Sequence, residues 1–393
     1  MNSKIIIILL FFCALIGTNY PIAAGVTWAD IFVAPLFFYT LANNWIKISN
    51  KDIIAKFSLV YAGLMLFSAL SNGTIDDTVF LNYFRIYVEG CVAYASLQIA
   101  LKGEKEKKFF GCMSFMYAIT FLLLTSMAMS SSIGERENFN DLSSGLYGGR
   151  NGMAVTNLLL IILLTYFVFL WQNKKVTFVF VLFPFFVFNI IFSASRFSVI
   201  SLFIFVLFVV IVMMNKLKRK NKIFIIAFAI VMPFTIDSIM SFMDADMMSY
   251  SSELLNKKMS NDSEAGLVFR LNELNIKVIY DWINDTPIYL WLFGDGISIT
   301  HGIFSFTFCS TGIIGFLYFT ITHYKMIKYY WKKARPYKYI AVLIFVFFLN
   351  DIVTNSRFTI GANTMLYMGM LAFFNRTSSM IGDNIISYRK AEK

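Results

Sequence analysis

The sequence has little charge, little proline and almost no histidine. Only 15% of its 393 residues are charged, against roughly 25% in average soluble domains. Six prolines and two histidines accompany 44 phenylalanines, and 58% of the residues are hydrophobic. This composition excludes a soluble enzyme and a disordered chain, and it predicts a protein embedded in a membrane.

The four cysteines form no recognisable site. They stand singly in apolar stretches, with no CxxC pair and no cysteine–histidine cluster: Cys13, Cys91, Cys112 and Cys309. This scatter indicates neither a metal site nor a disulfide framework. We expect all four to be buried within the membrane domain.

Long apolar runs recur along the whole chain, many of them near the roughly 20 residues that cross a bilayer as a helix. Twelve candidate spans lie near residues 5–24, 26–43, 53–71, 79–101, 109–130, 152–171, 176–194, 197–215, 223–240, 302–322, 339–353 and 359–375. The predicted fold is therefore all-α and polytopic, with about 12 transmembrane helices in a single domain over 1–393. One long loop, 241–301, lies within that domain.

The distribution of lysine and arginine predicts the orientation. If both termini are cytoplasmic, the inner loops hold 25 of the 34 basic residues and 5 of the 23 acidic ones. Every inner loop is then basic, as the positive-inside rule requires. We expect a multi-pass protein with cytoplasmic ends, and this charge pattern gives no support to nucleic-acid binding.

Arginine dominates the basic residues on the outer side. Six of the nine outer basic residues are arginine: Arg85, Arg136, Arg150, Arg196, Arg270 and Arg357. A guanidinium binds phosphate in a bidentate manner and keeps its charge when partly desolvated. These residues therefore suggest a phosphate-bearing ligand that approaches from outside. Arg85 and Glu89 lie one helical turn apart, so we expect them to form a structural salt bridge instead.

The long outer loop becomes amphipathic towards its end. Apolar and polar residues alternate at helical spacing over 267–279, which predicts a helix lying on the outer membrane surface and ending at Asp285-Thr286-Pro287. Gly294-Asp295-Gly296 follows, and this triplet predicts a tight turn into the next span. Trp282 belongs to a group of aromatics that could anchor at the interface or stack on sugars.

Few groups in the sequence could carry acid–base or metal chemistry. His301, at the outer end of a span, is an outward-facing side chain that titrates near neutrality, so it is either a general base or a structural helix-end residue. His323 is expected to be solvated at the inner end of that span. Asp244 and Asp246 resemble the metal-binding DxD of nucleotide-sugar transferases but fall on the outer side. Asp76-Asp77 is a weak metal candidate, and we predict no metal site.

Several short motifs, taken in order, resemble a known family. An NxxA follows a glycine-rich outer loop (Asn151–Ala154), SxSR follows it (Ser193–Arg196), and the long loop carries Arg270, Trp282, GxG and His301 before a GIIG turn (Gly312–Gly315). This order resembles the O-antigen polymerase and O-antigen ligase superfamily of bacterial inner membranes. The chain differs from the family at Gly302, where asparagine commonly follows the histidine.

The resemblance implies a metal-independent glycosyltransferase that works at the periplasmic face without a cofactor. The implied donor is a glycan on undecaprenyl pyrophosphate, and the acceptor is a sugar hydroxyl. By position, Arg196 and Arg270 match the arginines that hold the pyrophosphate, and His301 matches the acceptor base. Arg150, Asn151, Arg357 and Trp282 are the expected further substrate contacts. The implied partners are membrane lipids, a chain-length regulator and a flippase of the same lipopolysaccharide pathway.

Three functions remain open. A polymerase joins lipid-linked repeats to one another, whereas a ligase transfers the glycan to lipid A-core by the same chemistry. A flippase or exporter of lipid-linked sugar would carry out no reaction and should line its cavity with charge deep inside the spans. The outer clustering of arginines favours an enzyme, and the polymerase is our first expectation. The absence of a Walker A loop excludes ATP-driven transport.

Overall fold

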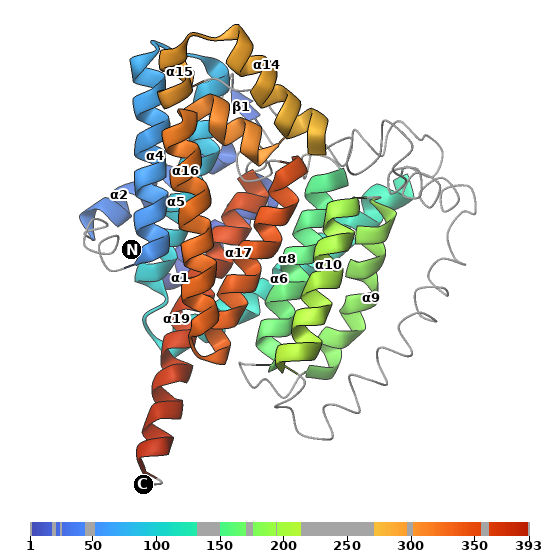
Figure 1. The fold of residues 1–393 in the computed structure, drawn as a ribbon. Helices are drawn as coiled ribbons and strands as arrows, with labels where there is room; N and C mark the ends of the chain where they lie inside the picture. Colours follow the sequence, from blue (N-terminus) through green and yellow to red (C-terminus); the bar gives the residue numbers. More distant parts are fainter. Residues whose placement is uncertain are drawn as a thin grey trace. The chain divides into compact units, whose positions relative to one another are not determined.

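The computed structural model describes residues 2–17, 21–23, 26–43, 52–131, 150–169, 176–193, 195–213, 271–296, 302–354 and 361–391 (Figure 1). These residues are overwhelmingly helical, which confirms the predicted helical class. The described part also contains one short antiparallel pair, in which β1 (Pro21–Ala23) lies against β2 (Val26–Thr27). The sequence reading did not anticipate this pair.

Most of the described helices begin close to the predicted spans, but two continue to Lys332 and Ala391, past the predicted ends at 322 and 375, and Pro21–Ala23 within the predicted span 5–24 is a strand. In chain order they are α1 (Ser3–Phe12), η1 (Cys13–Gly17), α2 (Trp28–Ala42), α4 (Ile53–Ser71), α5 (Thr78–Ala100), α6 (Glu104–Ser131), α8 (Arg150–Phe169), α9 (Val176–Phe192), α10 (Arg196–Phe208), η2 (Val209–Met213), η4 (Asn272–Lys277), α14 (Val278–Asp285), α15 (Ile288–Phe293), α16 (Ile303–Lys332), α17 (Arg335–Thr354) and α19 (Gly361–Ala391). The predicted span at 223–240 lies outside the described residues.

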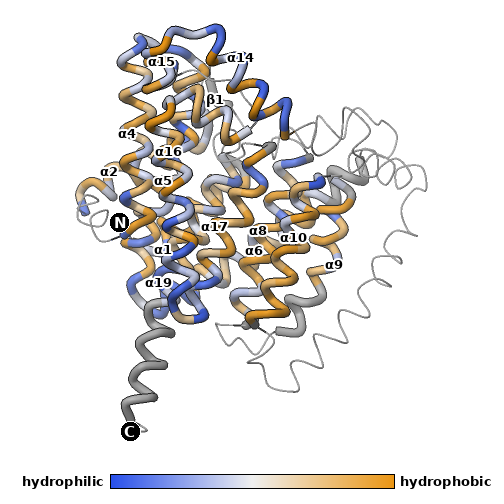
Figure 2. The backbone as a smooth tube through the Cα atoms, viewed as in Figure 1, coloured by the Kyte–Doolittle hydropathy of each residue, from blue (hydrophilic) through white to orange (hydrophobic). Residues whose placement is uncertain are grey.

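Three of the described helices are long and apolar enough to cross a membrane: Ile53–Ser71, Glu104–Thr125 and Ile303–Lys332. Five shorter apolar helices accompany them, among them Trp28–Ala42 and Arg196–Val212. Hydrophobic residues predominate along α4, α6, α8, α9 and α10, while polar residues concentrate near α14 (Figure 2). This composition is compatible with a membrane protein.

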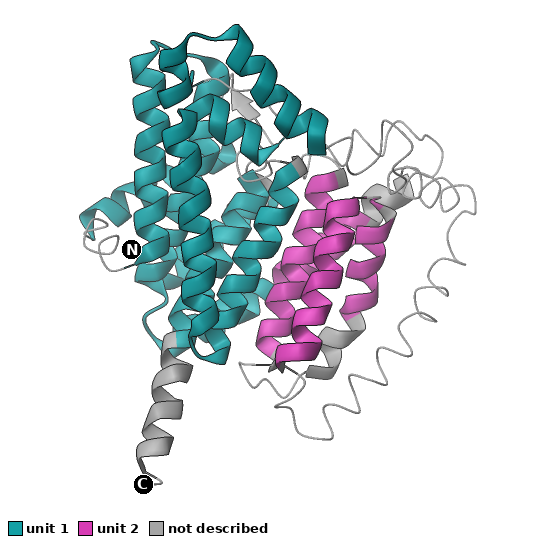
Figure 3. Ribbon diagram, viewed as in Figure 1, with its two compact units in different colours: residues 1–114, 268–393 teal, residues 115–267 magenta. Residues whose placement is uncertain are grey.

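The chain forms two compact units (Figure 3). Unit 1 comprises residues 1–114 and 268–393, and unit 2 comprises residues 115–267. Unit 1 is built around α5, which packs against α1, α2, α4 and α19. From Glu89 to Ala100 every residue of α5 is buried, as expected for a helix surrounded by others. Unit 2 contains α8, α9 and α10, which pack against one another.

Two predictions about single residues are wrong. His323 is 2% exposed, and its ring lies 4.1 Å from that of Phe319 and 4.8 Å from that of Phe57. It is buried because Phe57 from α4 and Phe348 from α17 pack against its ring, at a point where α16 continues to Lys332, well past the predicted end of the span. Cys112 is exposed on α6, whereas the other three cysteines are buried as predicted; all four are free thiols.

Candidate functional site

Two of the predicted outer arginines begin helices of unit 2. Arg150 is the first residue of α8 and Arg196 is the first residue of α10. Only six residues join α8 to α9, so these neighbouring helices run antiparallel, and α10 follows α9 after a short turn (Figure 1). The arginines therefore belong to the same end of unit 2.

A hydrogen bond between α8 and α9 shows how the positions of Arg150 and Arg196 along the helix axes compare. Asn189 Nδ2 on α9 donates to Asn157 Oδ1 on α8 over 3.3 Å. Arg150 precedes Asn157 by seven residues of α8, about 10 Å along the helix axis. On α9, Asn189 is followed by three more helical residues, about 4.5 Å, before the turn that leads to Arg196. The starts of α8 and α10 therefore lie at the same end of the unit, with both positive dipole ends and both arginines there.

Arg196 is buried, with 5% of its surface exposed, and three serines lie close to it in the sequence. The Ser193 Oγ donates to the Ile190 carbonyl and accepts from the Ser195 N–H, and Ser195 Oγ lies 3.1 Å from Ser198 Oγ. All three serines are buried. The described helices of unit 2 carry no Asp or Glu. This end of the unit therefore combines buried positive charge with hydroxyl donors.

Unit 1 contributes a second predicted region, the end of the long loop. The helix ends at Asp285 as predicted, although its first part, η4, is a π-helix. Trp282 Nε1 donates to Asp295 Oδ2 over 3.0 Å, and its ring packs edge-on against Phe308 at 5.7 Å. Trp282 is therefore already a structural contact of the Gly294–Gly296 turn. Its predicted role in substrate binding remains a prediction.

The Gly294–Gly296 turn closes a break in α16. Gly294 and Gly296 both have positive φ, as the predicted tight turn requires. Gly312 interrupts α16 with φ 64° and ψ −171°, which frees carbonyls of the preceding turn. The N–H groups of Asp295 and Gly296 donate to the carbonyls of Cys309 and Ser310. The GIIG motif is thus a helix break that the long loop covers.

The residue that caps α16 was missed in the sequence. Asn275, from η4, is 4% exposed, and its Oδ1 accepts from the N–H groups of Phe304 and Ser305. Its Nδ2 donates to the Ile352 carbonyl over 3.0 Å. A Cβ on Gly302 would lie 2.2 Å from Asn275 Oδ1. Asn275 therefore occupies the space that a side chain at position 302 would need.

Six of the residues singled out in the sequence lie in segments that the structure does not describe. His301, Arg270, Arg357, Arg136, Asp244 and Asp246 lie outside the described residues. The backbone of Arg150 is described within α8, and Asn151 beside it is exposed. Among the predicted residues the structure thus brings Arg150, Asn151 and Arg196 to one end of unit 2, and places Trp282 in unit 1.

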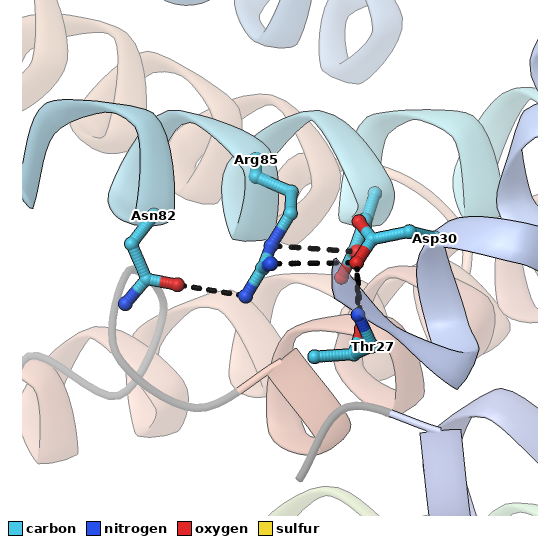
Figure 4. A network of polar contacts seen from close by, with 5 residues as sticks. Thr27, Asp30, Asn82 and Arg85 are labelled. Carbon is cyan, nitrogen blue, oxygen red and sulfur yellow. Dashed lines mark hydrogen bonds and ion pairs between the residues drawn. The ribbon is translucent and has the colours of Figure 1, made fainter. Parts of the chain in front are cut away.

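Arg85 differs from the other outer arginines in its surroundings. Arg85 Nη1 lies 3.3 Å from Asp30 Oδ2 and Nε lies 4.0 Å from Glu89 Oε1, while Nη2 donates to Asn82 (Figure 4). The predicted salt bridge with Glu89 is confirmed, and Asp30 from α2 joins it. Arg85 therefore belongs to a polar cluster of unit 1 rather than to an anion-binding group.

No metal-binding group of three or more His, Cys, Asp or Glu side chains occurs among the described residues. Asp77, half of the weak metal candidate, accepts from the N–H groups of Val79 and Phe80 and so caps the start of α5. On η4, the Glu273 carboxylate lies 2.9 Å from Lys277 Nζ and raises the pKa of that exposed lysine. Neither group points to metal chemistry.

No family model matches the chain, and no curated protein is significantly similar to it in sequence.

Proposed function

We propose that the chain is a polytopic inner-membrane glycosyltransferase, an O-antigen polymerase. It joins oligosaccharide repeats carried on undecaprenyl pyrophosphate at the periplasmic face, and about 12 spans with cytoplasmic termini hold the site. The proposal rests on the order of motifs in the sequence and on one structural observation. Arg150 and Arg196 begin two helices at the same end of unit 2, and Arg196 is buried there among serines.

The chemistry of the transfer explains how the arginine-bearing end of unit 2 would promote the reaction. An acceptor hydroxyl attacks the anomeric carbon of the donor sugar, and the bond between that carbon and the pyrophosphate oxygen breaks. The electron pair leaves with the pyrophosphate, so negative charge grows on the leaving group. Fixed guanidinium groups and helix N-termini stabilise this charge without reorganising during the reaction. The sugar–pyrophosphate bond supplies the free energy, so no nucleotide is needed.

The proposed roles follow from this scheme. Arg196, together with Arg270, holds the pyrophosphate. Arg150, Asn151, Arg357 and Trp282 contact the remainder of the substrate. His301 accepts the proton of the attacking hydroxyl, a task for which its ordinary titration range is suited. The helix that follows His301 begins at a position where Asn275 caps its first N–H groups.

Transport of the lipid-linked sugar is the second candidate function, and one observation favours it. Asp30, Arg85 and Glu89 form a charged cluster between α2 and α5, within predicted spans. Ionisable residues inside spans often mark transport pathways or proton relays. The decisive measurement is elongation of purified lipid-linked repeats by purified protein, because a transporter produces no polymer.

The ligase is distinguished genetically by the lipopolysaccharide of a deletion strain. Loss of a polymerase leaves a single repeat on the core, whereas loss of a ligase leaves bare core and lipid-linked polymer. We expect a single repeat on the core. Bare core with lipid-linked polymer would instead identify the protein as a ligase, whose acceptor is lipid A-core.

The anion-binding role is tested by conservative substitution in the elongation assay. Arg196→Lys should slow transfer by about 10²-fold, the usual cost of one lost transition-state donor, because an ammonium cannot make a bidentate phosphate contact. Arg136→Lys, in a loop between Glu135 and Glu137, is the matched control and should be nearly silent. Equal effects of the two substitutions would show that Arg196 does not act on the pyrophosphate.

The base is tested by the pH–rate profile in the same assay. His301→Ala should slow transfer by roughly 10²–10⁴-fold and remove an acidic limb near about pH 6.5. A variant that keeps the wild-type rate and the same limb would make His301 a helix-end residue and leave catalysis to the arginines.

A further inference from the structure

Two carboxyl groups and one guanidinium meet between α2 and α5 in unit 1. Asp30 lies in the first turn of α2 and faces Arg85 on α5 (Figure 4). Glu89 lies one turn after Arg85 on α5. The two helices pack against one another. The site therefore joins residues that are 55 positions apart in the sequence, and none of them is used in the proposed transfer reaction.

The carboxyl groups of Asp30 and Glu89 differ in the number of hydrogen bonds that they accept. Asp30 Oδ2 accepts from Thr27 N–H at 2.7 Å, from Thr27 Oγ1 at 2.8 Å and from Arg85 Nη1 at 3.3 Å. Glu89 is 3% exposed, and its Oε1 accepts no hydrogen bond. The nearest guanidinium nitrogen is 4.0 Å away, which is too far for a hydrogen bond. The buried carboxyl is thus the poorly satisfied one.

Among the described residues, one guanidinium faces two carboxyl groups. Arg85 Nη1 lies 3.3 Å from Asp30 Oδ2, and Arg85 Nε lies 4.0 Å from Glu89 Oε1. Ionised carboxylates only accept hydrogen bonds, so a bond between the two requires one of them to be protonated. The Cys13 thiol on η1 also interacts electrostatically with both carboxyl groups, and it supplies no positive charge.

We propose that Asp30 and Glu89 form a proton-binding site, in which Glu89 carries the proton and donates it to Asp30 beside Arg85. The side chains of Asp30 and Arg85 are 25% and 26% exposed, whereas that of Glu89 is 5% exposed. The proton therefore exchanges with solvent past Asp30 and Arg85. The ligand is a single proton, and a buried carboxyl between helices is a common setting for one.

Loss of this proton should destabilise the fold. Deprotonation leaves two anions beside one guanidinium, with one anion buried and without a hydrogen-bond donor at Oε1. Because the folded chain holds the proton more tightly than the unfolded chain does, the free energy of unfolding falls as the pH rises. Glu89→Gln has nearly the same shape and cannot ionise, so this substitution should remove the pH dependence.

The test compares the melting temperatures of the purified full-length protein and of Glu89→Gln in detergent between about pH 5 and pH 9. The two should agree at the acidic end, and the wild type should melt progressively lower at the alkaline end. In Asp30→Asn, Glu89 can ionise and pair with Arg85 alone, so the alkaline loss should disappear there too. A constant difference between wild type and Glu89→Gln across the range would overturn the proposal.

Chemical labelling provides an independent readout. Dicyclohexylcarbodiimide reacts with a protonated carboxyl group: the acid proton moves to a carbodiimide nitrogen, the carboxyl oxygen bonds to the central carbon, and an acyl shift gives a stable N-acylurea. Peptide mass spectrometry should find the adduct on Glu89, with most of it lost in Asp30→Asn.

Asp52 is the matched internal control for the labelling. Its two oxygens accept from the N–H groups of Ile54 and Ala55, from the Tyr94 hydroxyl and from Asn375 Nδ2. A carboxylate with these four donors needs no proton to be satisfied, so Asp52 should stay unlabelled. Preferential labelling of Asp52 over Glu89, or equal labelling of Glu89 in wild type and Asp30→Asn, would contradict the proposed site.

Discussion

The two units of the chain use polar side chains in different ways. In unit 1, polar groups join elements that are distant in sequence: Ser68 Oγ donates to the Ser310 carbonyl and Asn72 Nδ2 to the Gly294 carbonyl. In unit 2, Thr156, Asn157 and Thr165 donate to carbonyls three or four residues earlier on their own helix. Polar side chains thus connect distant elements in unit 1, whereas these three buried side chains of unit 2 bond within their own helix.

This difference has a simple physical origin. Unit 1 contains an interrupted helix, and the carbonyls freed at its break need donors from other elements. The described helices of unit 2 contain no glycine break of this kind, although α9 contains Pro184 and α10 continues into the π-helix η2. Their packing depends mainly on apolar contact. Substitutions at the polar joints of unit 1 should therefore cost more than substitutions at the polar link of unit 2.

Gly312→Ala should have the largest effect on stability. An alanine cannot easily adopt φ 64° with ψ −171°, and its Cβ would lie 2.3 Å from the Leu292 backbone carbonyl. We expect a loss above about 4 kcal/mol, measured by thermal or denaturant unfolding of the purified protein.

Gly63→Ala is the matched control for that substitution. Gly63 lies within α4 with nothing within 4 Å of an added Cβ, so alanine should be neutral or stabilise the helix by up to about 1 kcal/mol. Similar losses at the two positions would show that the break at Gly312 is not a rigid joint.

Asn275→Ala should cause the second-largest loss of stability. It removes the cap from the start of α16 and the bond to the Ile352 carbonyl, at a cost of about 2 kcal/mol in the free energy of unfolding. Asn275→Asp keeps the accepting oxygen and loses the donor to Ile352, so it should fall between wild type and alanine. An aspartate as damaging as alanine would mean that capping contributes little.

Asn189→Leu removes the polar link between helices of unit 2 and should lower the free energy of unfolding less than Asn275→Ala does. Asn189 Nδ2 bonds to Thr125 and Asn157 over 3.4 and 3.3 Å, near the upper limit for hydrogen bonds. Single interhelical bonds in membrane proteins average about 0.6 kcal/mol. A loss in unfolding experiments as large as that of Asn275→Ala would remove the contrast between the units.

Glu273→Gln should be the mildest change. Glu273 and Lys277 form an exposed pair one turn apart on η4, and such pairs add little to stability. Because Glu273 raises the pKa of Lys277, any stabilisation is present at neutral pH and is lost only as the pH rises through that raised pKa. The melting temperature at neutral pH should therefore be unchanged, and a clear drop would indicate a further role for Glu273.

The sequence predicted features well where residues close together in the chain decide them. The run at 53–71 became α4 with the same bounds, Gly294-Asp295-Gly296 became a turn, and Arg85 met Glu89 one turn away. Each of these depends on residues within a few positions of one another. The order of motifs from Asn151 to Gly315 also lies in the sequence, and the proposed function depends on it.

The candidate sites depended more on contacts that no local pattern contains. No local pattern indicated that Asp30 would join Arg85, or that Asn275 would cap the start of α16. His323 was misplaced for the same reason, because its burial depends on Phe57 from another helix.

The sequence by itself determined a helical, strongly apolar chain and the positions of its arginines. Helix formation and hydrophobic burial act over short stretches, so periodicity and composition suffice to predict them. Only the tertiary structure decided what surrounds each charge: serines at Arg196, carboxyl groups at Arg85. Those neighbours come from packing between helices, and a charge takes its chemical role from the groups that packing places beside it.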